Sequence, residues 1–175
     1  LGTAGTIRAN REFFSDQTVL LAHADNWCQC DLDKFMIYHF EERPSHCPMT
    51  MMTFDTTMPS ACGVVTLNSQ GVVQSFHEKV AKPPGNLANG AVYLIEPEVV
   101  EWIEASPEVK DFSTEVIPAF MGRIATWHND KIHRDIGTIE SLRLAQTDPS
   151  PIPLWLDLDE WQMAFRKNPI HFAVR

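Results

Sequence analysis

The sequence has few basic residues, no long apolar run and no cysteine framework. Lysine and arginine number 14 against 23 acidic residues, which gives a net charge of −9. Nucleic acids and anionic membranes bind basic faces, so both are disfavoured as partners. No stretch reaches the roughly 20 apolar residues that span a bilayer, and no signal-peptide pattern is found. We therefore expect a cytoplasmic protein with no nucleic-acid partner and no membrane partner.

The four cysteines, Cys28, Cys30, Cys47 and Cys62, do not have the spacing of a small disulfide-stapled domain. We expect them to be reduced thiols. The alternative is a zinc site built from Cys28, Cys30, Cys47 and His46. It is disfavoured because two ligands separated by one residue fit structural zinc poorly.

The apolar content is sufficient for a folded core, because 44% of the residues are hydrophobic and 21% are charged. Strand-length apolar runs are found at Gln17–Ala24, Met49–Asp55, Cys62–Leu67, Val72–Lys79, Ala91–Ile95 and Ile124–His128. Helical patterns are found at Asp31–Arg43, Pro97–Ile103, Ser113–Met121 and Thr138–Thr147, and in a first helix that Thr3 or Thr6 can cap and that runs to about Phe14. This alternation predicts an α/β fold with a layered, mixed and mostly parallel sheet.

Two expectations concern particular strands and the end of the chain. The unbroken apolar run at 17–24 predicts a central strand that is buried on both faces. Residues 1–147 are expected to form one domain, and residues 148–175 a Pro-rich linker and an aromatic tail. The tail carries Trp155, Trp161, Phe165 and Phe172, which need a surface to cover them. We expect it to pack back on the domain or to join a neighbouring subunit in a homo-oligomer.

Two aspartates end predicted strands. Asp135 is followed by Gly137, which allows a sharp turn, and by Thr138, which can cap the next helix. Asp25 also follows an apolar run, although taken alone it is better explained as a turn residue. Ligands of open α/β sheets bind at strand ends. We therefore predict that Asp25 and Asp135 meet at one site and hold a hard cation such as Mg²⁺.

Five short motifs occur in order and together resemble those of the sugar-1-phosphate nucleotidyltransferases. They are Leu1-Gly2-Thr3-Ala4-Gly5, Ala24-Asp25-Asn26, Phe76-His77-Glu78-Lys79, Asn89-Gly90-Ala91-Val92-Tyr93 and Arg134-Asp135-Ile136-Gly137-Thr138. The family has Gly before the first aspartate, Pro after the lysine, Ala-Gly where this chain has Gly90-Ala91, and an aromatic residue where His133 stands. The resemblance covers residues 1 to about 146. It implies a Rossmann-like three-layer nucleotidyltransferase fold.

The resemblance also implies an activity. The family joins a nucleoside triphosphate to a sugar 1-phosphate and releases pyrophosphate, with Mg²⁺ as cofactor. It assigns Asp25 and Asp135 to the metal and Lys79 to the sugar phosphate. It assigns Glu78, Asn89 and Gly63 to the sugar, and Gly2, Thr3, Ala4 and Gly5 to the base, with GTP as the favoured donor.

Simpler interpretations of the same residues stay open at this point. Glu78 and Lys79 can be a solvated ion pair, Asn89-Gly90 a turn, and Gly63 a bulge. The family's glycine-rich Gly-Thr-Arg loop, which grips the triphosphate, is not among the 175 residues. We expect an N-terminally truncated sheet. The alternative is a protein of the same fold that binds nucleotide sugars as an inactive or regulatory subunit.

Overall fold

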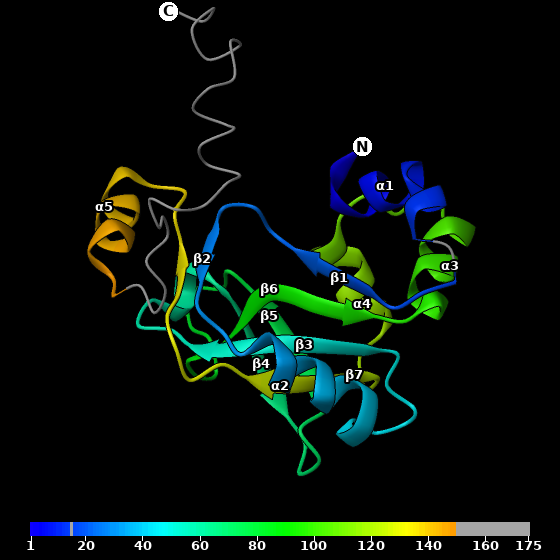
Figure 1. Ribbon diagram of the computed structural model, residues 1–175, viewed down its shortest axis with the longest axis horizontal. Helices are drawn as coiled ribbons and strands as arrows, with labels where there is room; N and C mark the ends of the chain where they lie inside the picture. Colours follow the sequence, from blue (N-terminus) through cyan, green and yellow to red (C-terminus); the bar gives the residue numbers. More distant parts are fainter. Residues whose placement is uncertain (15, 150–175) are drawn as a thin grey trace, which may run out of the picture.

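A mixed sheet covered by helices on both faces forms the centre of the computed structural model, which describes residues 1–14 and 16–149 (Figure 1). Alternate residues of the central strands pack in opposite directions. Met49, Met51 and Tyr93 belong to the larger core, which also holds the buried residues of α1 (Gly2–Ala9) and α3 (Pro97–Ala105). Met52 and Leu94 instead pack with Phe35 of α2 (Leu32–Ile37). The two clusters confirm the expected three-layer α/β fold.

Five strands lie in the order β5-β4-β6-β3-β7, and β1 pairs with β6. Their bounds are β1 Val19–Ala22, β3 Met49–Asp55, β4 Gly63–Leu67, β5 Val73–Glu78, β6 Leu87–Ile95 and β7 Ile124–His128. Only β3 and β7 are parallel within the described ranges, so the expectation of mostly parallel pairing is wrong. The connections from β3 through β6 contain no long crossover, and antiparallel pairs are what short connections produce.

The remaining helical segments are η1 (Arg11–Phe13), η2 (Tyr38–Glu42), η3 (Pro59–Ala61), η4 (Phe112–Val116), α4 (Ile117–Ala119) and α5 (Ile139–Thr147). Thr138 caps α5 as predicted, because its side chain accepts from the Ser141 amide. The predicted cap of the first helix is wrong, since α1 follows Leu1 and has no side-chain cap. Thr3 instead accepts a 2.7 Å hydrogen bond from the Phe112 amide, which ties α1 to η4.

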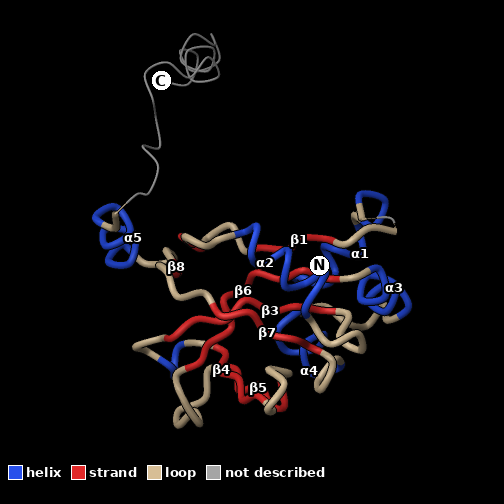
Figure 2. Tube along the Cα trace, turned by 60° about the horizontal axis from the view of Figure 1, so that its bottom comes forward, coloured by secondary structure: helices blue, strands red, loops and turns tan. Residues whose placement is uncertain are grey.

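Strand β1 differs from the central strand that the apolar run predicts. It shares one edge of β6 with β4, and its other edge pairs with no strand in residues 1–14 and 16–149 (Figure 2). Its side chains alternate between half-buried and exposed, and Leu20 is 50% exposed. The prediction of burial on both faces is therefore wrong for this part of the chain.

A two-stranded ribbon joins β2 (Asn26–Cys28) to β8 (His133–Asp135) beside the sheet. Strand β8 ends at Asp135, as the sequence predicts, whereas β2 is too short to leave a periodic pattern. Asp148 and Pro149 are the last described residues, so the expected tail at 154–175 lies outside the described ranges. Among the described helices, none is long and apolar enough to cross a membrane.

Candidate functional site

One polar cavity of about 860 Å³ gathers residues from six separate stretches of the chain, within 23–26, 54–63, 78–79, 89–91, 111–114 and 133–144. It is lined by six of the residues that the sequence singles out, namely Asp25, Gly63, Glu78, Lys79, Asn89 and Asp135. They come from the β1–β2 connection, the start of β4, the end of β5, β6 and the end of β8. The fold therefore brings together residues up to 110 positions apart in the sequence.

The β2–β8 ribbon sets Asp25 beside Asp135. Asn26 pairs with Asp135 across the ribbon, and the Ile136 amide donates a 2.8 Å hydrogen bond to the Asp25 carbonyl. The Asp135 Oδ1 atom accepts a 2.7 Å hydrogen bond from the Gly137 amide, which fixes the carboxylate and leaves its second oxygen available. Both residues are exposed, so solvent and ligands can reach their carboxylates.

The cavity is strongly acidic. Its acidic lining residues are Asp25, Asp55, Glu78, Asp111, Asp135 and Glu140. Of the two lysine or arginine residues in the lining, Arg134 is held by Asp148 through hydrogen bonds of 2.8 and 2.9 Å. Lys79 is 68% exposed at its side chain and lies 3.8 Å from Glu78, so its ammonium remains accessible. A polyphosphate ligand could enter such a cavity only with cations that offset the acidic charge.

The donor set fits Mg²⁺ better than zinc. Carboxylate oxygens are the ligands that Mg²⁺ prefers, and this ion is commonly held by one or two carboxylates together with substrate phosphates. Asp25 and Asp135 supply that number. No group of three or more His, Cys, Asp or Glu side chains in the described ranges is placed to hold a metal, so the zinc alternative gains no support there.

Lys79 and Gly63 both occupy restricted positions. Lys79 has φ +49°, a left-handed conformation that is uncommon for a residue with a side chain, and its amide donates to the Cys62 carbonyl. Gly63 pairs with Glu78 across β4 and β5. A Cβ atom on Gly63 would lie 2.6 Å from Glu78 Oε2 and 2.5 Å from the Phe76 ring. The absence of a side chain at Gly63 therefore leaves the space in which Glu78 lies.

A bulge in β6 orients Asn89. Tyr93 pairs with Met51 and Asn89 pairs with Thr53, so three residues of β6 oppose Met52 alone. Ala91 takes φ +51° there, and its amide donates to Asn89 Oδ1 at 2.9 Å. Asn89 Nδ2 donates to the Tyr93 hydroxyl at 2.6 Å. The amide is held on both sides and keeps one N–H and one lone pair for a ligand.

His133 fills the aromatic position of the last motif. Its ring stacks on Phe54 with centroids 4.1 Å apart, and its Nε2 atom lies 2.7 Å from the Gly90 carbonyl. Because a carbonyl only accepts, Nε2 carries the proton. Burial lowers the pKa of His133, so the neutral ring is favoured. The sequence assigned no role to this histidine, and the structure shows that it connects β8 to the bulge of β6.

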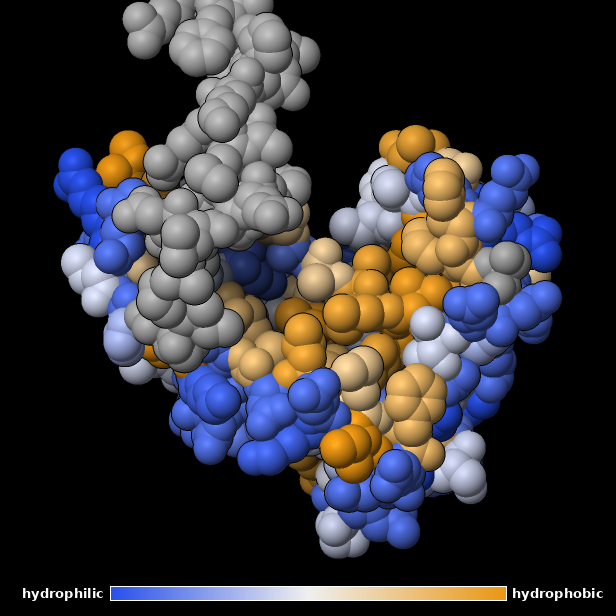
Figure 3. All heavy atoms as spheres, in the orientation of Figure 1, coloured by the Kyte–Doolittle hydropathy of each residue, from blue (hydrophilic) through white to orange (hydrophobic). Residues whose placement is uncertain are grey.

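A second, mostly apolar cavity of about 720 Å³ adjoins the first and shares His23 and Asp25 with it. Its apolar lining residues are Ile7, Phe13, Phe14, Leu21, Ala22, Ala24 and Phe112. Figure 3 shows apolar side chains over this hollowed region near β1 and α1. Thr3 also lines it.

The first motif forms the opening turn of α1 rather than a loop. Ala4 is fully buried, and the amides of Ala4 and Gly5 both donate to the Lys110 carbonyl. Gly2 and Gly5 line neither cavity. The expected main-chain contacts to a base at Ala4 and Gly5 are therefore already satisfied within the protein, which leaves the Thr3 side chain at the cavity.

Sequence reasoning missed several residues of the polar cavity. Asp55 ends β3 and is exposed, and Asp111 caps η4 by accepting a 2.8 Å hydrogen bond from the Thr114 amide. Burial raises the pKa of Asp111, but the hydrogen bonds from Thr114 lower it by more, so the pKa lies below its usual value. Asp55 carried a usable signal, since it is a third aspartate at the end of a predicted strand.

Comparison with known proteins agrees with this architecture. The family model for nucleotidyl transferases matches residues 1–150. The chain is 28% identical over 170 residues to a glucose-1-phosphate adenylyltransferase of Clostridioides difficile, covering 90% of this chain and 44% of that protein. It is 29% identical over 160 residues to the Bacillus licheniformis protein of the same name, covering 84% and 41%. The chain thus spans less than half the length of the curated relatives it matches.

A solved structure from Bacillus anthracis that carries the name glucose-1-phosphate thymidylyltransferase superposes with a TM-score of 0.71. The sequences are 18% identical, and the match covers 82% of this chain and 59% of that one. At this identity the likeness supports the fold, including the Rossmann-like arrangement expected from the sequence. The family match over residues 1–150 shows that the chain belongs to the nucleotidyl transferase family.

Proposed function

We propose that the protein transfers a nucleoside monophosphate from a nucleoside triphosphate to a sugar 1-phosphate, giving a nucleotide sugar and pyrophosphate. The observation that carries the proposal is the convergence of Asp25, Asp135 and Lys79 on one acidic cavity beside an apolar one. The reaction is an in-line displacement at the α-phosphorus by an oxygen that is already ionised. It depends on charge neutralisation and positioning rather than on a strong base.

The two cavities suit the two halves of such a reaction. The base of the nucleotide would occupy the apolar cavity beside Thr3, and the sugar would occupy the polar cavity. Asp25 lines both, which is where the phosphates of the two substrates must meet. Lys79 would bind the sugar phosphate as a point charge. Glu78 and Asn89 would hydrogen-bond the sugar hydroxyls, and Gly63 leaves the space that the Glu78 carboxylate occupies.

Asp25 and Asp135 would hold Mg²⁺ as the cofactor. When bound, the ion would neutralise charge on the substrate phosphates and help to orient them. The chain's own contribution is the rigid placement of the two carboxylates. Gly137 donates to Asp135, and the Ile136 amide fastens the Asp25 backbone to β8.

The identity of the base is a finer part of the proposal. The Leu1–Gly5 motif favours GTP, for mannose or heptose 1-phosphate. The curated relatives are named as adenylyltransferases and the solved structure as a thymidylyltransferase, so ATP and dTTP are the competing donors. A cytoplasmic location and a homo-oligomer formed through the tail remain further proposals.

The test is pyrophosphate release by the longest natural reading frame that contains these residues. GTP, ATP, dTTP, UTP and CTP are each supplied with mannose, heptose or glucose 1-phosphate, with Mg²⁺ and then with excess chelator. We expect turnover with one base in clear excess and none with chelator. Nucleotide-sugar binding without turnover for any pair would reject the enzyme and favour the regulatory subunit.

A further inference from the structure

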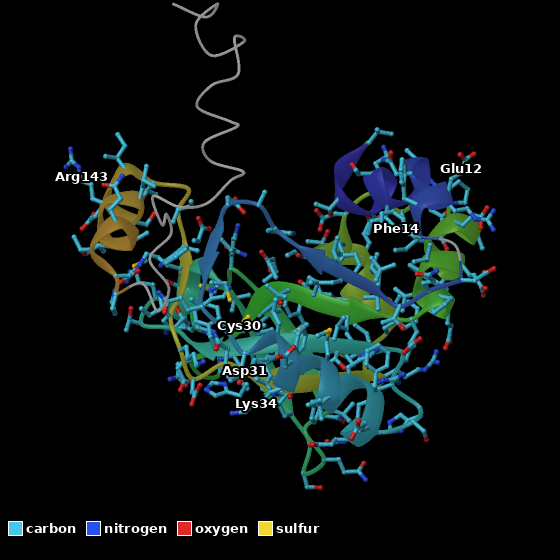
Figure 4. The ribbon with its side chains drawn as sticks, viewed as in Figure 1. Glu12, Phe14, Cys30, Asp31, Lys34 and Arg143 are labelled. Carbon is cyan, nitrogen blue, oxygen red and sulfur yellow. The ribbon has the colours of Figure 1, made fainter. Side chains whose placement is uncertain are left out.

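A pair of thiols lies at the end of the β2–β8 ribbon, outside the proposed reaction. Cys28 is the last residue of β2 and pairs with His133, and Cys30 follows two residues later, immediately before α2. Both cysteines are half-buried and neither forms a disulfide in the structure. Figure 4 shows Cys30 beside Asp31 and Lys34 where the ribbon runs into α2.

The two side chains pack against the same apolar cluster of Phe35, Met52, Val92 and Leu94. Residues two apart on an extended segment point to the same side, and their Cα atoms are about 6.6 Å apart. A disulfide joins Cα atoms about 4.4 to 6.8 Å apart, so closing a bond needs only a small bend at Gln29. The thiols are close enough to shift each other's pKa. Cys28 Sγ also lies 3.7 Å from Met52 Sδ and 3.9 Å from Asn129 Nδ2, which hold it toward the sheet.

The surroundings divide the roles of the two sulfur atoms. The neighbouring Cys28 thiol, assisted by Lys131 and opposed by burial and Asp31, lowers the pKa of Cys30 to about 7. The neighbouring Cys30 and burial raise the pKa of Cys28. Cys30 is therefore substantially thiolate near neutral pH, and the thiolate is the form that attacks disulfides.

We propose that Cys28 and Cys30 form a reversible disulfide by exchange with low-molecular-weight disulfides. The Cys30 thiolate attacks the external disulfide, forms a mixed disulfide and releases one thiolate. Cys28 then loses its proton to solvent and attacks Cys30 Sγ, which closes the Cys28–Cys30 bond and releases the second thiolate. Two protein thiols are oxidised and one external disulfide is reduced to two thiols.

The position of the pair gives the modification a place to act. Cys28 is paired with His133, which stacks on Phe54 and contacts the Gly90 carbonyl, and the same short strand ends at Asp135. A bend at Gln29 would pull on its amide, which donates a 2.8 Å hydrogen bond to the Ile132 carbonyl just before β8. The disulfide is thus placed to change the ribbon that sets Asp135.

The test uses oxidised glutathione, alkylation of the remaining thiols, unfolding and tryptic digestion. Trypsin gives residues 12–34 with Cys28 and Cys30, and residues 35–79 with Cys47 and Cys62, because Pro44 protects the Arg43 bond. We expect both cysteines of peptide 12–34 to become protected from alkylation together. The peptide should then weigh two hydrogen atoms less than its reduced, unalkylated form. Peptide 35–79 serves as the internal control and should stay fully alkylated.

Single variants test the order of the steps. Cys28→Ser should accumulate the mixed disulfide on Cys30, Cys30→Ser should leave Cys28 largely unreacted, and Cys62→Ser should close the ring as the parent does. The preference for Cys30 should disappear in urea, where the folded surroundings that lower its pKa are lost. Alkylation of peptide 12–34 at the rate of peptide 35–79, or stable glutathione adducts without ring closure in the parent, would overturn the proposal.

Discussion

Exchanging Ala91 for glycine should cost almost no stability, although glycine normally weakens a strand. Ala91 has φ +51°, and the left-handed region costs a residue with a Cβ atom about 1–2 kcal/mol. Glycine removes that cost but adds about 0.5–1 kcal/mol of backbone entropy to the unfolded chain. Loss of a half-buried methyl group takes away a few tenths more. We expect the free energy of unfolding of Ala91→Gly to lie within about 0.5 kcal/mol of that of the parent.

The matched control is Ala88→Gly on the same strand. Ala88 is fully buried and does not have a positive φ. The glycine variant therefore adds backbone entropy to the unfolded chain and loses a buried methyl group, with no strain relieved in the folded state. Its expected cost is about 1.5 kcal/mol. In a domain of this size each kcal/mol lowers Tm by about 2–4 °C. Urea titration at a constant m-value measures both variants.

The reverse kind of exchange at the neighbouring residue, Gly90→Ala, should destabilise the protein. A Cβ atom on Gly90 would lie 3.1 Å from the Met52 carbonyl and 3.2 Å from His133 Nε2. We expect Gly90→Ala to cost about 1–3 kcal/mol, because the neighbours on both sides must move. If Ala91→Gly were as damaging as Ala88→Gly, the strain assigned to the bulge would be refuted.

Three further predictions concern the site and the core. Asp135→Asn keeps the oxygen that accepts from the Gly137 amide, so it should fold normally yet lower Mg²⁺-dependent turnover about a hundredfold or more. Asp130→Asn, on the exposed surface, is the control and should keep the parent rate. A wild-type rate for Asp135→Asn would exclude Asp135 as a metal ligand. Gly63→Ala should lower the free energy of unfolding by about 1–3 kcal/mol in urea titration, whereas Gly85→Ala, with nothing within 4 Å, should not. Burial and Arg43 lower the pKa of His39 below 6.5, so on acidification the unfolded state takes up the proton before the folded state does. The free energy of unfolding should therefore fall as the pH drops from about 7 to 5, by up to about 1.4 kcal/mol per pH unit. His39→Gln should flatten this pH dependence.

Local patterns predicted the elements whose causes are local. The Asn68 side chain accepts hydrogen bonds from the Gln70 and Val72 amides, which closes the β4–β5 hairpin between two of the predicted strands. Thr138 caps its helix as expected, and Asp31, where the second predicted helix begins, caps α2. These outcomes depend on hydrogen bonds within a few residues, so the sequence determines them directly.

The sequence did not predict how strands that are distant in the chain pair with one another. The direction of β6, its bulge at Ala91 and the three-residue ribbon depend on partners dozens of positions away. The cap of α1 was also mispredicted, because the Thr3 hydroxyl accepts a hydrogen bond from the Phe112 amide, which is remote in sequence. No periodicity within a short window records such partners.

By itself, the sequence determined the layered α/β class and the motifs at Asp25, Lys79 and Asp135, because strand length, caps and turn chemistry act within a few residues. Tertiary structure alone decided that these side chains share one acidic cavity, that His133 supports the β6 bulge and that the amides of Ala4 and Gly5 are already satisfied. Each of these depends on contacts across the sheet, where packing and not local preference selects the neighbour.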